Sequence, residues 1–255
     1  MSTALAMERI AEASPRLTAR AAGFFWLMTF VLGVYALAGD RLVLWNDAAA
    51  TAANIVVREP EFRLGTAANL LATVSYLVAT VLVYDLLKPL NRNLSLLAAF
   101  FSLAGCAISG LSFIFRLAPL LVLGDVPYMS VFTAEQLQAQ AHTFLRLGGL
   151  AFYISSVFFG LHCLLVGYLI VRSRFLPRFV GGLMIFAGVG WLTMSFANLL
   201  APPFGRSLSP YILLPGMLGE GTLSLWLLIV GVNVRRWKER TDAAWQRRSQ
   251  RPVQP

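Results

Sequence analysis

Residues 147–171 read LGGLAFYISSVFFGLHCLLVGYLIV. No charged side chain interrupts this stretch, and about 20 apolar residues in a helix are enough to cross the hydrocarbon core of a bilayer. The stretch therefore predicts a membrane-spanning helix. Five further stretches have the same character, which gives six predicted spans at about 21–38, 65–87, 94–117, 147–171, 179–200 and 212–234.

The composition of the whole chain points the same way. Of its 255 residues, 58% are hydrophobic and 13% are charged, whereas soluble domains carry about a quarter charged residues. So few charges cannot cover a water-soluble globule of this length, which excludes a soluble enzyme, a DNA-binding module and a disordered tail. We therefore expect an all-α polytopic membrane protein with six transmembrane helices.

The net charge of +9 has a topological explanation. Fifteen of the 21 Lys and Arg residues fall in the N-terminus, the turns near 88–92 and 172–178, and the C-terminus, all on one side of the six spans. Positive residues favour the cytoplasmic side, so both termini are predicted to be cytoplasmic, and nucleic acid is not expected as a partner. The expected organisation is a cytoplasmic N-terminus over 1–20, a transmembrane domain over 21–234 and a basic cytoplasmic tail over 235–255.

The connections on the opposite side are longer. Residues 46–57 predict a short interfacial helix within the first of them. Thr133-Ala-Glu-Gln136 has the pattern of a capping box, so a helix beginning there is expected to run into the fourth span. The basic tail, with Trp237 and Trp245, is typical of a segment held on anionic lipid or is a simple topology anchor, and its last residues are expected to be disordered.

Several stretches carry a resemblance to a known family. They are RLG at 63–65, YDLLKPLNRNL at 84–94, FFGLHCLLVGYLI at 158–170, LPR at 176–178, LGE at 218–220 and LWLL at 225–228. From about Arg16 to Val234 the chain resembles the bacterial multi-pass membrane family catalogued as domain of unknown function 4386. The resemblance implies six membrane helices and a bacterial inner membrane, and it implies no activity.

A faint internal repeat has a spacing of 83 residues. Arg63-Leu-Gly recurs at Arg146, and Ala104-Gly recurs at Ala187. Two explanations stay open: duplication of a helical hairpin, which is common in membrane bundles, or the shared apolar composition of two hairpins.

Polar side chains within the spans predict where helices meet. In the third span such residues recur at steps of three and four, so they lie on one helix face, and small residues there allow close helix contact. This face consists of Ser102, Gly105, Ser109, Ser112 and Arg116. Measured along each helix from the basic end, at about 1.5 Å per residue, the ionisable and amide groups of the spans gather in the outer half.

These outer groups define a candidate binding site. An unpaired carboxylate is costly inside a membrane, so we expect Arg116 or Arg146 to pair with Glu220, or Glu220 to hold a proton. One interpretation is an outward-facing pocket for an amphiphile with an anionic head and an apolar tail. The other is a structural Arg116–Glu220 pair that locks the bundle. The predicted ligand-binding residues are Arg116, Glu220, Arg146, Asn69, Tyr76, Tyr153, Trp191 and Asn198.

Recognisable catalytic and cofactor motifs are absent from the sequence. His142 and His162 lie 20 residues apart on one predicted helix, about 30 Å, so they cannot share a metal or a haem. Cys106 and Cys163 are predicted to be buried free thiols. No cofactor and no metal are expected, and an enzyme is the less favoured class. In an enzyme, His162 or Glu220 would be the base and a lipid the substrate.

Three functional hypotheses therefore remain. The first is binding, transport or sensing of a small amphiphile or lipid. The second is an accessory subunit that packs against other membrane proteins or against copies of itself. The third is an intramembrane lipid-modifying enzyme. Membrane lipids are expected partners under all three.

Overall fold

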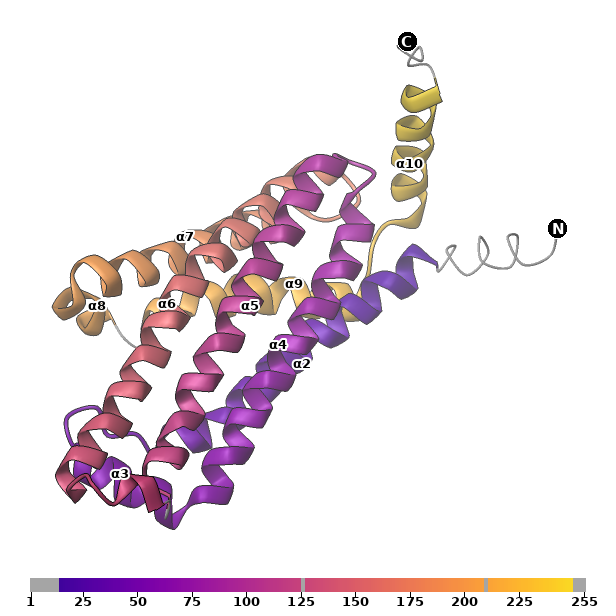
Figure 1. Ribbon diagram of the computed structural model, residues 1–255. Coiled ribbons are helices and arrows are strands. Elements are labelled where there is room, and N and C mark those ends of the chain that lie inside the picture. The colour runs from indigo at the N-terminus through magenta and orange to yellow at the C-terminus, as the bar shows by residue number, and fades with distance from the viewer. Residues whose placement is uncertain (1–13, 125–126, 209–210, 250–255) are drawn as a thin grey trace, which may run out of the picture.

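The computed structural model describes residues 14–124, 127–208 and 211–249, and within them all regular structure is helical (Figure 1). The six helices long and apolar enough to cross a membrane confirm the predicted fold class, and the chain is a multi-pass membrane protein. They are α2 (Pro15–Asp40), α4 (Glu59–Leu87), α5 (Arg92–Val122), α6 (Ala134–Ser173), α7 (Arg178–Leu200) and α9 (Leu214–Ile229), the last preceded by the 3-10 turn η2 (Tyr211–Leu213).

Shorter helices fill the connections. Helix α3 (Ala48–Val57) confirms the predicted short helix, and the Asp47 side chain caps it by accepting a hydrogen bond from the Ala50 amide at 2.8 Å. Two other connections contain η1 (Pro127–Met129) and α8 (Pro202–Leu208), and α10 (Val234–Ser249) follows the last span. Helix α8 was not predicted from the sequence. The last residues were expected to be disordered, and positions 250–255 lie outside the described part of the chain.

Two helix ends are informative. Thr133 forms the predicted capping box with Gln136, and α6 runs without a break for 40 residues. The sixth span was expected to continue to Val234, and this is wrong: α9 ends at Ile229. Gly231 has a φ of +77°, a conformation that costs glycine little because it has no Cβ. The chain turns there and resumes as α10.

The six long helices pack in a closed circuit. Helix α2 contacts α4, which contacts α5, and the series continues through α6, α7 and α9 back to α2. In this circuit α5 and α9 occupy opposite positions. One end of the bundle carries the start of α2, the α4–α5 and α6–α7 turns and α10, and we call it the basic end. The other carries α3 (Figure 1), and we call it the α3 end.

Small residues set the spacing between helices. On α6 and α7, Gly160 faces Gly188 and Gly167 faces Gly181, and a Cβ on any of these four would lie 3.0 Å or less from the facing glycine's carbonyl oxygen. The predicted small face of α5 is confirmed, because Ser102, Gly105, Ser109 and Ser112 are buried. Its hydroxyls bridge to neighbouring helices: Ser102 meets Thr80 at 2.7 Å, and Ser109 donates to Ser155 at 3.0 Å.

Candidate functional site

The most deeply buried carboxyl group of the spans belongs to Glu220 on α9. Its side chain is 4% exposed. The Trp26 indole on α2 donates to one carboxyl oxygen at 3.0 Å, and the Trp191 indole on α7 donates to the other at 2.6 Å. Because α9 packs between α2 and α7, both of its neighbours in the circuit supply a donor.

Further polar side chains surround this carboxyl group. The Tyr76 ring lies 5.3 Å from Trp26 and 5.8 Å from His162, centroid to centroid. The His162 Nδ1 atom lies 2.8 Å from the Ala98 carbonyl oxygen. A carbonyl only accepts, so Nδ1 carries the proton of the neutral ring and Nε2 is an acceptor. We call Trp26, Tyr76, His162, Cys163, Trp191 and Glu220 the central cluster.

Two polar atoms of the central cluster are unsatisfied. The Tyr76 hydroxyl and the His162 Nε2 are buried and have no hydrogen-bond partner within the described residues. Tyr76 is 7% exposed and His162 is 1% exposed. Buried polar groups without partners are uncommon and call for an explanation. Cys106 and Cys163 are both buried free thiols, as predicted.

The predicted pairing of Arg116 or Arg146 with Glu220 is wrong. The Arg116 guanidinium pairs with Asp40 at 2.7 Å and donates to the Thr66 hydroxyl at 3.1 Å, whereas Arg146 donates to the Trp45 carbonyl at 2.9 Å. The circuit of helices explains the error, because α5 and α9 are not neighbours. The two sites are also about 21 Å apart along α2, the rise between Trp26 and Asp40.

The eight predicted residues therefore fall into separate places. Glu220, Tyr76 and Trp191 come together in the central cluster. Arg116 and Arg146 lie at the α3 end. The other three lie elsewhere. The Asn198 side-chain amide donates to the Met194 backbone carbonyl at 2.8 Å. The backbone carbonyl of Asn69 accepts from Thr73 of the same helix at 3.0 Å, and the backbone carbonyl of Tyr153 accepts from Ser195 of α7 at 2.5 Å.

Sequence reasoning missed the partners of these residues. Trp26 looks like one more apolar residue of the first span, and only the fold reveals its N–H as a donor to Glu220. Asp40 stands at the end of that span. Arg116 was predicted to lie at the same side of the membrane, so the sequence did contain a signal for an Asp40–Arg116 pair. The Trp45 carbonyl, which contacts both His142 and Arg146, left no such signal.

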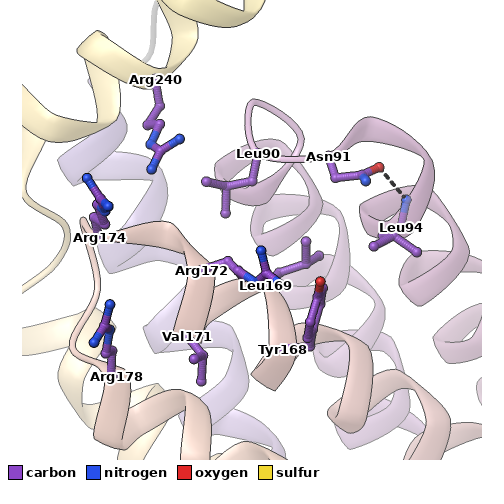
Figure 2. A pocket seen from close by; sticks show the side chains of 10 residues that line it. All are labelled: Leu90, Asn91, Leu94, Tyr168, Leu169, Val171, Arg172, Arg174, Arg178 and Arg240. Atoms are coloured by element: carbon purple, nitrogen blue, oxygen red, sulfur yellow. Dashed lines mark hydrogen bonds between the residues drawn. The ribbon is translucent and has the colours of Figure 1, made fainter.

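A second site lies at the basic end. A cavity of about 450 Å³ opens between the α4–α5 turn, the end of α6 and α10 (Figure 2), and we call it the arginine pocket. Figure 2 shows the Arg240 side chain descending from α10 toward the turn that carries Arg174. The lining residues are Leu90, Asn91, Leu94, Tyr168, Leu169, Val171, Arg172, Arg174, Arg178 and Arg240.

The arginine pocket is strongly positive. Four of its ten lining residues are arginines and none is acidic. Among the residues that the structure describes, none of these four guanidinium groups forms an ion pair. Arg172 lies over the Tyr168 ring, 5.2 Å from its centroid. From the sequence, Arg172, Arg174 and Arg178 were explained by topology, and Arg240 was placed in a tail held on anionic lipid or serving as a topology anchor. Their convergence on one cavity was not foreseen, because the position of α10 was unknown.

Comparison with known proteins places the chain in a family. It is 26% identical over 158 residues to an uncharacterized protein of Archaeoglobus fulgidus, a match that covers 59% of this chain and 74% of the archaeal one. No solved structure matches. The family described as "Domain of unknown function (DUF4386)" matches residues 21–231, close to the stretch over which the resemblance was recognised. This match covers the central cluster and every lining residue of the arginine pocket except Arg240. It spans more than half of the chain, and the chain belongs to that family.

Proposed function

We propose that this protein binds an anionic phospholipid, with the lipid phosphate in the arginine pocket. The proposed ligand is of the class expected from the sequence, an amphiphile with an anionic head and an apolar tail. Its head, however, is proposed to bind at the basic end and not at the α3 end. Arg116 and Arg146 at the α3 end are engaged by Asp40 and Trp45. The arginines of the pocket are not engaged by any acid of the described residues.

The observation that carries the proposal is the convergence of four unpaired guanidinium groups on one cavity. A guanidinium presents several N–H donors in a plane that matches phosphate geometry. Like charges held together repel one another, so a cluster of four is stabilised by an anion between them. Basic pockets between transmembrane helices on the cytoplasmic side are known to suit anionic lipid head groups.

The lining also fits the rest of a lipid molecule. Leu90, Leu94, Leu169 and Val171 supply apolar surface beside the arginines. Tyr168 at the pocket edge is 41% exposed, and aromatic rings of this kind favour the boundary between lipid tails and head groups. The pocket therefore pairs a positive region with an apolar one, which suits the junction between the head and the tails of a phospholipid.

The test is lipid binding to the purified protein and to two matched variants. Native mass spectrometry would count bound phosphatidylglycerol, which is anionic, and phosphatidylcholine, which has no net charge. Arg172→Gln/Arg178→Gln removes two pocket charges. Arg235→Gln/Lys238→Gln removes two charges from exposed positions of α10 outside the lining and is the control.

We expect the pocket variant to lose affinity for phosphatidylglycerol by about 30-fold, since each arginine contributes about 1 kcal/mol toward anionic lipid. The control should change much less. Equal losses in both variants would mean that net charge alone attracts the lipid, and the proposal would fail. Displacement of the lipid by millimolar inorganic phosphate would instead assign the pocket to a soluble anion.

We also propose that the membrane is the bacterial cytoplasmic membrane and that the basic end faces the cytoplasm. The support is the Lys and Arg asymmetry of the connections. The domain organisation follows the same proposal, with a transmembrane domain over 21–234 flanked by cytoplasmic segments over 1–20 and 235–255. Lipids of the cytoplasmic leaflet are then the ones that reach the arginine pocket.

A further inference from the structure

The central cluster is a second candidate site, independent of the arginine pocket. From His162 to Arg172, α6 rises about 15 Å, so the two sites lie at different depths. Glu220 stands within α9, between Leu214 and Ile229, and it forms no ion pair with any of the residues described. A carboxyl group at such a place is costly to ionise unless its surroundings stabilise the charge.

The two indoles stabilise the ionised form. An indole N–H donates and cannot accept. Trp26 and Trp191 each donate to a different oxygen of Glu220, which is the arrangement that solvates a carboxylate. Neither tryptophan can receive the proton of a neutral carboxylic acid, so the protonated form needs another acceptor.

The same cluster holds acceptors for the neutral form. The His162 Nε2 has a lone pair, and the Tyr76 hydroxyl accepts as well as donates. Both atoms are buried and lack a hydrogen-bond partner in the described chain. Tyr76 and Cys163 also lie close enough to interact electrostatically with Glu220. The cluster thus contains partners for both charge states of the carboxyl group.

We propose that Glu220 is the proton-binding residue of an intramembrane site, in which the Tyr76 hydroxyl accepts a hydrogen bond from the protonated carboxyl group and the His162 Nε2, beside Tyr76, is the nearby base. When Glu220 is protonated, its O–H donates to the Tyr76 hydroxyl. When the proton leaves, the O–H bond breaks, both carboxyl oxygens accept from the indoles, and the proton passes to His162 or out of the protein. The ligand of this site is the proton itself.

The groups facing Glu220 come from every helix packed around it. Helices α2 and α7 present Trp26 and Trp191, which do not titrate. Helix α4 presents Tyr76 and α6 presents Cys163, while His162 of α6 lies beside Tyr76, 5.8 Å between ring centroids. Cys106 of α5 lies close enough to Tyr76 to interact electrostatically with it. No arginine or lysine is among them, so no fixed cation balances the carboxylate.

The test is an infrared titration of the protein reconstituted in phosphatidylcholine vesicles. A protonated carboxylic acid has a C=O stretching band that a carboxylate lacks. We expect a band that fades as the pH rises and that is missing from Glu220→Gln. Glu239→Gln makes the same chemical change at an exposed position of α10 and should leave that band in place.

Two tryptophan variants keep the test decisive if Glu220→Gln does not fold. Trp26→Phe and Trp191→Phe each keep an aromatic ring and remove one donor to the carboxylate. In either variant the acid band should persist to higher pH than in the wild type. If the Glu220 band is absent at every pH, or is unchanged across the whole stable range, the group does not exchange a proton and the proposal is overturned.

Discussion

The Arg116 guanidinium divides its donors among partners from two helices. It pairs with Asp40 of α2, donates to Thr66 of α4 and lies 4.8 Å from the Phe62 ring centroid. Arg116 is 17% exposed and Asp40 is 44% exposed at the side chain. A pair with one largely buried partner is screened less by solvent than a surface pair, so this contact should contribute measurably to stability.

A double-mutant cycle tests that contribution. The free energy of unfolding in detergent would be measured for Arg116→Gln, Asp40→Asn and the combination. We expect a coupling energy of about 1–3 kcal/mol, the range for hydrogen bonds to charged groups. The control cycle uses Arg63 and Glu59, whose side chains are 57% and 46% exposed and whose coupling should stay below about 1 kcal/mol. Equal coupling in both cycles would show that Arg116 acts as a surface residue.

At the scale of elements, α9 depends on the absence of side chains where it crosses α7. A Cβ on Gly219 would meet the Leu183 carbonyl oxygen and would lie 2.7 Å from the Ala187 Cβ. Two residues further along the same helix, a Cβ on Gly221 would have no atom within 4 Å. The backbones of α7 and α9 therefore approach closely on one face only, and that approach places Trp191 beside Glu220.

The two glycines give a matched pair of variants. Gly219→Ala should lower thermal stability, because overpacking a tight contact costs about 1–3 kcal/mol. Gly221→Ala should be neutral or stabilising by up to about 1 kcal/mol, since alanine favours helix over glycine. Melting curves in detergent would compare them. A Gly219→Ala protein as stable as the wild type would contradict the close packing of α7 and α9.

The six spans, α3 and the start of α6 were predictable because their signals are local. An apolar run of sufficient length defines a span, and Thr133 with Gln136 defines the start of α6. The neighbours of each helix were not predictable, because a span that is apolar all round does not mark the face that meets a partner. Arg116 and Glu220 were matched because both were placed in the outer half of the spans. The fold separates them in two ways: α5 and α9 are on opposite sides of the circuit, and the two groups are about 21 Å apart along α2. The role of Trp26 and the arginine pocket were missed for the same reason, because both depend on which helices are neighbours.

At the scale of the whole molecule, the distribution of charge predicts how the bundle sits in its membrane. The basic end should face the cytoplasm and the α3 end the exterior. Single cysteines would be introduced at Ser14, Arg235 and Tyr128, which are exposed, in a protein whose two native cysteines are buried. A membrane-impermeant maleimide applied to intact cells should label Tyr128→Cys only. Labelling of Ser14→Cys or Arg235→Cys instead would reverse the topology.

Helix α6 reaches from one end of the molecule to the other. Its 40 residues span about 60 Å, roughly twice the thickness of a hydrocarbon core. Arg172 of the arginine pocket is near one of its ends, and His142, which contacts the Trp45 carbonyl, is near the other. Because α6 is so long, a tilt of about 5° about one of its ends would displace the opposite end by about 5 Å. A ligand that tilts α6 by binding on one side of the bilayer would therefore displace the end of α6 on the other side.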